Sequence, residues 1–131
     1  MSAENVEIVK RVTDAFNRRD VDAVLDFCAS DCVVSSQLLD VSADFQGREG
    51  LERFYGILGE SWDEFRSVVD DYRDLGDRVL VLGRNQGRGT GSGVSVDGPM
   101  GAVFDFRDGN VSRIRLYLDH GEALRAAGLS E

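Results

Sequence analysis

Apolar side chains recur at helical spacing in three stretches of the first half of the chain. Over residues 4–17 they form one stripe, and a shorter stretch follows the potential N-cap residue Asp20 up to residue 28. A third stretch lies beyond Gly47, where apolar side chains in residues 51–62 are three and four positions apart. Each stretch is apolar on one side only, so the pattern predicts three helices that each bury one face.

In the second half of the chain the apolar period falls to two, which is typical of strands. Four strands are predicted, at residues 64–75, 78–88, 93–106 and 110–119. Turn-forming residues separate them and predict hairpins at Gly76-Asp77, around Ser92 and at Asp108-Gly109-Asn110. The second half is therefore expected to form an antiparallel meander.

Two shorter segments complete the pattern. Residues 30–39 contain Val33 and Val34 among serines and favour an extended chain, while residues 121–128 predict a last helical turn that Gly128 ends. Three helices followed by a meander predict an α+β domain in which the helices pack on one face of the sheet.

The stretch GRNQGRGTGSG, from Gly83 to Gly93, resembles a phosphate-binding loop in composition but not in spacing. Neither G-x-G-x-x-G nor G-x-x-x-x-G-K-[ST] can be matched to it, and both motifs run from a strand into a helix. Here the glycines join two strand patterns. They predict a glycine-rich hairpin that bends around the helices, because glycines within strands mark bulges and close approaches.

Composition narrows the class of protein further. The 131 residues are expected to form one domain, 1–131, and a formal charge of −9 at pH 7 makes nucleic acid an unfavourable partner. No export signal or membrane span is recognised, so a cytoplasmic location is expected. Cys28, Cys32 and a single histidine are too few for a four-ligand zinc site, so no metal is expected and both thiols are expected to be reduced.

Three strings resemble the SnoaL-like domains of the nuclear transport factor 2-like superfamily: ENVEIVKRVTDAFNRRDVDAVLDFCASDCVV, FQGREGLERFY and FDFRDGNVSRIRLYLDHGEAL. The resemblance covers nearly the whole chain. It implies a cone-shaped α+β barrel, with a curved antiparallel sheet wrapped around three helices and a central pocket. Polyketide cyclases, ketosteroid isomerases, dehydratases, epoxide hydrolases and non-enzymatic modules all use this fold, so the fold alone does not give the function.

The catalytic groups of the ketosteroid isomerases are missing from the matching positions. By the resemblance, their general base falls on Ser36, and the tyrosine and aspartate of their oxyanion hole fall on Val12 and Ala102. None of these three side chains can perform the corresponding step. Isomerase chemistry of that type is therefore not expected.

The hydrolases and cyclases of the superfamily match only in part. The arginine of the limonene-type epoxide hydrolases is matched by Arg84, but their two aspartates fall on Gln86 and Leu116. The aspartate and histidine of SnoaL-like cyclases have no certain counterpart, although His120 lies near the end of the last predicted strand. Arg84, Gln86 and His120 are therefore the catalytic candidates, and no cofactor is implied.

Alternation along the strands predicts which side chains face the pocket. The expected wall consists of Leu80, Leu82, Arg84, Gln86, Arg88, Met100, Ala102, Phe104, Phe106, Ser112, Ile114, Leu116 and Leu118. Its composition, apolar with a few polar points, is typical of a small-molecule pocket. The predicted ligand-binding residues are Val12, Phe16, Ser36, Phe54, Tyr55, Trp62, Arg84, Gln86, Ala102, Phe104 and Leu116.

Four polar side chains each allow two interpretations. Arg84 either binds a ligand oxygen or pairs with an acid such as Asp105, and Gln86 either orients a ligand or satisfies the backbone at a bend. Tyr55 is either a hydrogen-bonding group of the pocket or a core residue with its hydroxyl at the surface. His120 is either a base or the solvent-facing cap of the last helix.

Two functions are consistent with these patterns. The first is binding of a small apolar or aromatic molecule, with isomerase, cyclase or hydratase activity that needs no cofactor. The alternative is a non-catalytic ligand-binding or dimerisation module of the same fold. The resemblance also implies a homodimer through the outer face of the sheet, which is expected to carry Val79, Val81, Val103, Tyr117 and Arg115.

Overall fold

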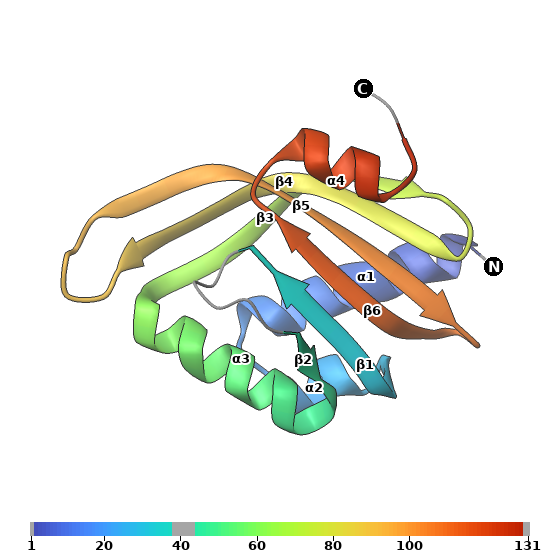
Figure 1. The fold of residues 1–131 in the computed structure, drawn as a ribbon, viewed down its shortest axis with the longest axis horizontal. Helices are drawn as coiled ribbons and strands as arrows, with labels where there is room; N and C mark the ends of the chain where they lie inside the picture. Colours follow the sequence, from blue (N-terminus) through green and yellow to red (C-terminus); the bar gives the residue numbers. More distant parts are fainter. Residues whose placement is uncertain (1, 38–43, 130–131) are drawn as a thin grey trace.

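The computed structural model of the chain describes residues 2–37 and 44–129, which form one α+β unit (Figure 1). Its helices are α1 (Ser2–Asn17), α2 (Val21–Leu25), α3 (Gly47–Ser61) and α4 (His120–Ala126). Its strands are β1 (Cys28–Ser36), β2 (Phe45–Gln46), β3 (Trp62–Asp74), β4 (Arg78–Gly89), β5 (Ser95–Arg107) and β6 (Asn110–Tyr117). The predicted fold class is confirmed, and so are the four strands of the meander.

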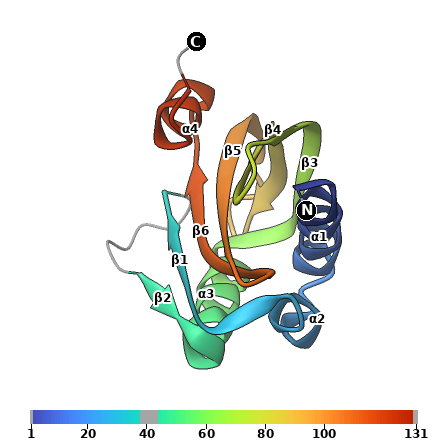
Figure 2. The ribbon, with the colours of Figure 1, turned by 90° about the vertical axis from the view of Figure 1, so that its right-hand side faces the viewer.

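All six strands belong to one curved sheet in the order β2-β1-β6-β5-β4-β3 (Figure 2). Neighbouring strands are antiparallel except for β1 and β6, which pair in parallel from Cys28 opposite Val111 to Ser36 opposite Leu116. The segment predicted only as extended chain is therefore a member of the sheet. Because β2 and β3 lie at opposite edges, the sheet curves around the helices without closing.

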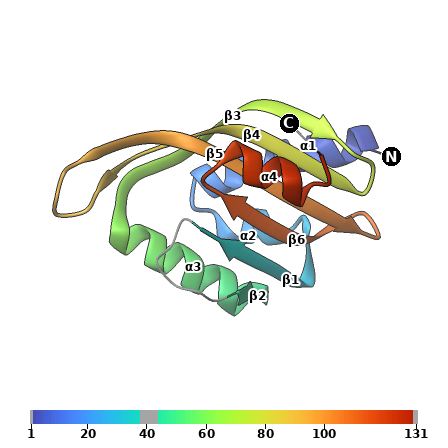
Figure 3. The same ribbon diagram turned by 45° about the horizontal axis from the view of Figure 1, so that its top comes forward.

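Both faces of the sheet are covered, each by different helices. The inner face packs against α1, α2 and α3, whose side chains Val9, Val24 and Leu58 are completely or almost completely buried there. On the outer face, α4 lies across β5 and β6 (Figure 3) and packs Ala123 and Leu124 against a second apolar cluster. The three helices of the first half therefore lie on one face, as expected, and α4, for which no face was predicted, covers the other.

The expected alternation is correct in β5 and in β6 from Ile114 on, but is off by one residue in β4. At the start of β6, a bulge opposite Asp105 and Phe106 puts Val111 in the inner cluster in place of the expected Ser112, whose hydroxyl donates to the Asp105 carbonyl. Val81 pairs with Ala102 and shares the inner face with it, whereas Leu80 and Leu82 belong to the cluster under α4. Residues 79–82 are all apolar because both faces are buried here, so the sequence contains no alternation to read. The correction moves Arg84, Gln86 and Arg88 to the outer face.

The second helix is shorter than predicted. It begins after Asp20, whose carboxylate accepts a hydrogen bond from the backbone N–H of Ala23 at 3.1 Å, but it ends at Leu25.

Strand β1 begins at Cys28 and contains a bulge. Four residues lie between Cys28 and Val33, whereas only one residue lies between their partners on β6. This bulge lets the Cys28 and Cys32 thiols hydrogen-bond to each other, which together with burial raises the pKa of Cys28. Both cysteines are free.

The glycine-rich stretch forms the predicted hairpin between β4 and β5, an arm that extends past the body of the domain (Figure 1). Gly91 and Gly93 in its turn have φ values of 83° and 69°, which favour glycine. Gly87 allows the rings of Phe65 and Trp62 to approach, since a Cβ there would lie 3.1 Å and 3.4 Å from them. These glycines therefore have structural roles within a strand-to-strand connection.

The predicted homodimer surface also changes. Val79 and Val81 face inward and Val103 lies under α4, which leaves Arg115 and Tyr117 as partly buried residues of the outer face. Asp105 pairs there with Arg78 at 2.7 Å and with Arg115 at 3.5 Å. Dimer formation stays a prediction.

None of the helices in the described part of the chain is long and apolar enough to cross a membrane.

Candidate functional site

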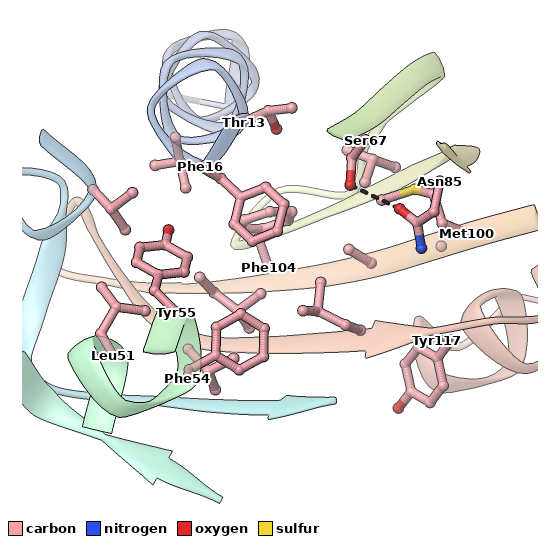
Figure 4. Close-up of a pocket in the computed structure, with 18 of the residues that line it drawn as sticks. Thr13, Phe16, Leu51, Phe54, Tyr55, Ser67, Asn85, Met100, Phe104 and Tyr117 are labelled. Carbon is pink, nitrogen blue, oxygen red and sulfur yellow. Dashed lines mark hydrogen bonds between the residues drawn. The ribbon is translucent and has the colours of Figure 1, made fainter. Parts of the chain in front are cut away.

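A cavity lies between the inner face of the sheet and the helices α1 and α3 (Figure 4). It encloses about 680 Å³ of empty space when the solvent at its mouth is included. Most of its wall is aliphatic or aromatic. The lining residues are Val12, Thr13, Phe16, Val24, Val34, Leu51, Phe54, Tyr55, Ser67, Val81, Asn85, Met100, Gly101, Ala102, Phe104, Ile114, Leu116, Tyr117 and Leu118.

Aromatic side chains from different elements form one end of this wall. The ring centroid of Phe16 on α1 lies 5.6 Å from Tyr55 and 6.4 Å from Phe54, both on α3, and 6.3 Å from Phe65 on β3. The Arg19 guanidinium lies 5.3 Å from the ring centre of Phe16 and 5.7 Å from that of Phe65. It also donates hydrogen bonds to the backbone carbonyls of the same two residues. These contacts tie α1 to β3 beside the cavity.

A chain of hydrogen bonds runs from the end of α1 to the cavity wall. Asn17 at the end of α1 pairs with the backbone of Ser67 on β3, accepting from its N–H at 2.8 Å and donating to its carbonyl at 2.9 Å. The Ser67 hydroxyl in turn donates to Oδ1 of Asn85 on β4 at 2.8 Å. Asn17 therefore holds β3 as a neighbouring strand would, and Ser67 holds the amide of Asn85.

Asn17→Ala is expected to lower the free energy of unfolding by about 2 kcal/mol, because two partly buried hydrogen bonds are lost. Urea denaturation followed by circular dichroism measures this change. Asn5→Ala is the matched control on the same helix, since Asn5 makes one exposed bond, to the Gly76 carbonyl. The control is expected to lose about 0.5 kcal/mol or less. Equal losses would contradict the anchoring role of Asn17.

Asn85 is the most distinctive polar group of the wall. Its side chain is only 9% exposed, and Oδ1 is already engaged by Ser67. Figure 4 shows the amide nitrogen on the side of Asn85 that faces away from this bond. Within residues 2–37 and 44–129, that nitrogen forms no hydrogen bond. The cavity wall thus carries an available hydrogen-bond donor.

Tyr55 contributes its ring to the wall and a protonated hydroxyl. Burial raises the pKa of this hydroxyl, and the positive charge of Arg19 opposes the shift without cancelling it. Tyr55 therefore stays neutral at physiological pH and cannot act as a base.

Seven of the predicted ligand-binding residues lie around the cavity: Val12, Phe16, Phe54, Tyr55, Ala102, Phe104 and Leu116. Ser36 ends β1 opposite Leu116, and Trp62 packs on Phe65 at a centroid distance of 5.8 Å; both lie outside the lining set. Sequence reasoning missed several lining residues, among them the polar Thr13, Ser67 and Asn85. The signal for Asn85 is its place between Gly83 and Gly87 at alternate positions, which are the inner positions of β4.

The three catalytic candidates lie elsewhere. Arg84 and Gln86 are on the outer face of β4, where each contacts the carboxylate of Asp97 at 3.3 Å and Arg84 is also 3.9 Å from Asp70. Arg84 therefore pairs with acids, although not with Asp105 as expected. His120 begins α4, and its Nε2 lies 2.9 Å from the backbone carbonyl of Gly83, which joins that helix to β4. We assign none of the three a role in the cavity.

A family model described as the SnoaL-like domain matches residues 9–114. The chain belongs to this family. No curated protein matches the sequence significantly. An NTF2-like protein from Burkholderia pseudomallei K96243 shares the fold of this SnoaL-like domain with a TM-score of 0.81 and 23% identity, covering 93% of this chain and 95% of its own.

Two further solved structures have the same fold. A candidate polyketide cyclase from Xanthomonas campestris pv. campestris has a TM-score of 0.73 and 28% identity, covering 92% of this chain and 94% of its own. TerC, co-crystallised with polyporic acid, has a TM-score of 0.80 and 19% identity, covering 88% and 92%. The SnoaL-like fold of this chain is therefore shown by both sequence and structure.

The chemistry of the cavity in this SnoaL-like domain is limited by its lining. No Asp, Glu, His, Lys, Arg or Cys is among the residues that line it in the described part of the chain. Val12 and Ala102 lie in the wall at the positions that match the isomerase oxyanion hole, but neither can donate a hydrogen bond. Groups of three His, Cys, Asp or Glu residues suited to a metal are likewise absent from the described residues. None of the described lining side chains is an acid or base that exchanges protons at neutral pH, and the polar groups of the wall are suited to orienting a molecule.

Proposed function

We propose that this SnoaL-like domain binds a small apolar or aromatic molecule in its cavity and does not transfer protons on it. The observation that carries the proposal is a cavity with an aromatic end and, among its described lining residues, no Asp, Glu, His, Lys, Arg or Cys. Burial of an apolar ligand there removes its surface from water, which favours binding. Cavities of this composition are the usual small-molecule sites of proteins.

The relatives support binding more than any one reaction. TerC has the same fold and was crystallised with a small organic molecule, and the Xanthomonas protein is a candidate polyketide cyclase. Acid–base catalysis requires a group that accepts a proton near neutral pH. Since Tyr55 stays protonated and the lining residues that the structure describes include no carboxylate or histidine, we do not propose isomerase, cyclase or hydratase activity.

Met100 supplies a direct test, because it lies in the wall and the only other methionine is Met1. In protein labelled with ¹³C at the methionine methyl groups, isopropylbenzene is expected to shift the Met100 resonance saturably. Ala102→Phe is expected to abolish the shift, since Ala102 is fully buried in the wall and a ring there fills the space.

The matched control is Val94→Phe, which adds the same ring to the exposed hairpin arm and is expected to leave binding unchanged. Circular dichroism checks that both variants are folded. A wild type that shows no saturable shift would instead support the alternative, a module of this fold that acts without a ligand.

A further inference from the structure

The buried amide of Asn85 restricts which molecules the cavity can accept. Asn85 is 9% exposed, and its Nδ2, which borders the cavity, forms no hydrogen bond with the described residues. This nitrogen is open to the cavity, since Arg115 Nε is the one fully enclosed side-chain donor without a partner in the described part of the chain. A ligand that covers Nδ2 removes a hydrogen-bond donor from water, which is unfavourable unless the ligand itself supplies an acceptor.

The amide is held with its nitrogen toward the cavity. Oδ1 accepts from the Ser67 hydroxyl at 2.8 Å, and the backbone of Ser67 is fixed by both polar atoms of Asn17. Figure 4 shows this bond on one side of Asn85 and the nitrogen on the other. Because the donor is oriented before the ligand arrives, binding an acceptor requires little further ordering of the side chain.

The cavity disfavours an anion at the same place. Over residues 2–37 and 44–129, no cationic side chain lines it: the Arg19 guanidinium is bound to two backbone carbonyls, and Arg84 pairs with Asp97 on the outer face. A buried carboxylate would lack a counter-charge, which is far more unfavourable than burying a neutral carbonyl.

We infer that Asn85 determines specificity: the cavity selects an uncharged apolar molecule with a carbonyl, ether or ring-nitrogen acceptor, which receives a hydrogen bond from Nδ2. The inference rests on the proposed function, because it names the ligand class of the same cavity. It assigns to Asn85 the contact with a ligand oxygen that the sequence had suggested for Arg84.

Three probes of nearly the same shape test this inference: acetophenone, isopropylbenzene and benzoate. Their dissociation constants are measured from the Met100 methyl shift. In the double variant Ser67→Ala/Asn85→Leu, both partners of the buried bond become apolar, so no polar group is left unpaired and the fold is expected to persist. Relative to wild type, acetophenone is expected to bind this variant about fivefold to tenfold more weakly, while isopropylbenzene changes less than about twofold.

The affinity of each probe is compared between the wild type and the variant. The difference in hydration free energy between acetophenone and isopropylbenzene therefore cancels. Asn85→Asp is a second variant that keeps the Ser67 bond but offers the ligand no donor, and it is expected to weaken acetophenone binding as well. Gln86→Leu is the matched control, since Gln86 is the next residue on the opposite face of β4. It is expected to leave both affinities unchanged, and benzoate is expected not to bind the wild type measurably.

The outcomes separate this inference from the proposed function. Equal changes for acetophenone and isopropylbenzene in the double variant would overturn the role of Asn85 while the cavity remained a binding site. Benzoate binding as tightly as acetophenone would overturn the selection for uncharged ligands. Saturable binding by neither neutral probe in the wild type would overturn the proposed function and this inference with it.

Discussion

Gly83→Ala is expected to lower the free energy of unfolding by about 3 kcal/mol, the upper range for added atoms in a packed region. A Cβ at this position would overlap the backbone carbonyl oxygen of Val68 and lie 2.8 Å from Cα of Val69, both on β3. Atoms of a paired neighbouring strand cannot turn aside as the tip of a side chain can. The strands must therefore separate at the place where β3 bulges between Val69 and Asp71.

Urea denaturation of Gly83→Ala and Gly98→Ala provides the comparison. Gly98 is also in the β4–β5 hairpin, but a Cβ there would have no atom within 4 Å, so its substitution is expected to change stability by about 0.5 kcal/mol or less. The pair separates steric contact from the general effect of replacing a glycine in a strand. Similar losses in both variants would show that β3 yields to the added methyl group.

The fold was predictable because most elements carry their own local signal. The hairpins at Gly76 and Asp108-Gly109 follow from turn residues, and both glycines have positive φ values in the structure. Along β5 and β6, apolar and polar residues alternate clearly enough to assign Ala102 and Ile114 to the cavity correctly. Charged residues at the alternate positions Asp105, Arg113 and Arg115 mark the other face of these segments, so the sequence records the difference.

Where both faces of a strand are buried, the local sequence pattern does not show which side chains face the cavity. In β4, Leu80 packs under α4 and Val81 packs over the cavity, and both are apolar. The following residues are glycine or polar on either face, so only the pairing of Val81 with Ala102 shows which face is which. The resemblance drew attention to Arg84, one residue from the group that reaches the cavity, Asn85. Strand register depends on contacts between distant residues, which a single sequence does not record.

The same limit applies to α4. Its residues predict a short helix that Gly128 ends, and Gly128 does follow it with a φ of 86°. The face it covers depends on Gly101 of β5, where a Cβ would overlap that of Ala123. The absence of that one Cβ lets the helix approach the outer face closely. This long-range contact gives no periodic signal in the sequence.

Phe54→Ala is expected to lower the free energy of unfolding by about 3–5 kcal/mol, the usual loss for a buried phenylalanine. Phe54 is 1% exposed, and its ring centroid lies 5.4 Å from Phe45 and 5.7 Å from Tyr55, at the aromatic end of the cavity. Truncation removes these contacts and leaves a void that is continuous with the cavity. Because the neighbouring side chains already border open space, they cannot move in to fill this void.

Denaturation with urea measures the loss, with Val94→Ala as the control for removing an apolar side chain that is 60% exposed. The control is expected to change stability by about 0.5 kcal/mol or less. Phe54→Ala is also expected to bind isopropylbenzene more weakly, because part of the wall that contacts the ring is gone. A loss below about 1 kcal/mol, with isopropylbenzene affinity unchanged, would contradict this role: the cavity would then keep its shape without the aromatic cluster, and another part of the wall would have to hold it open.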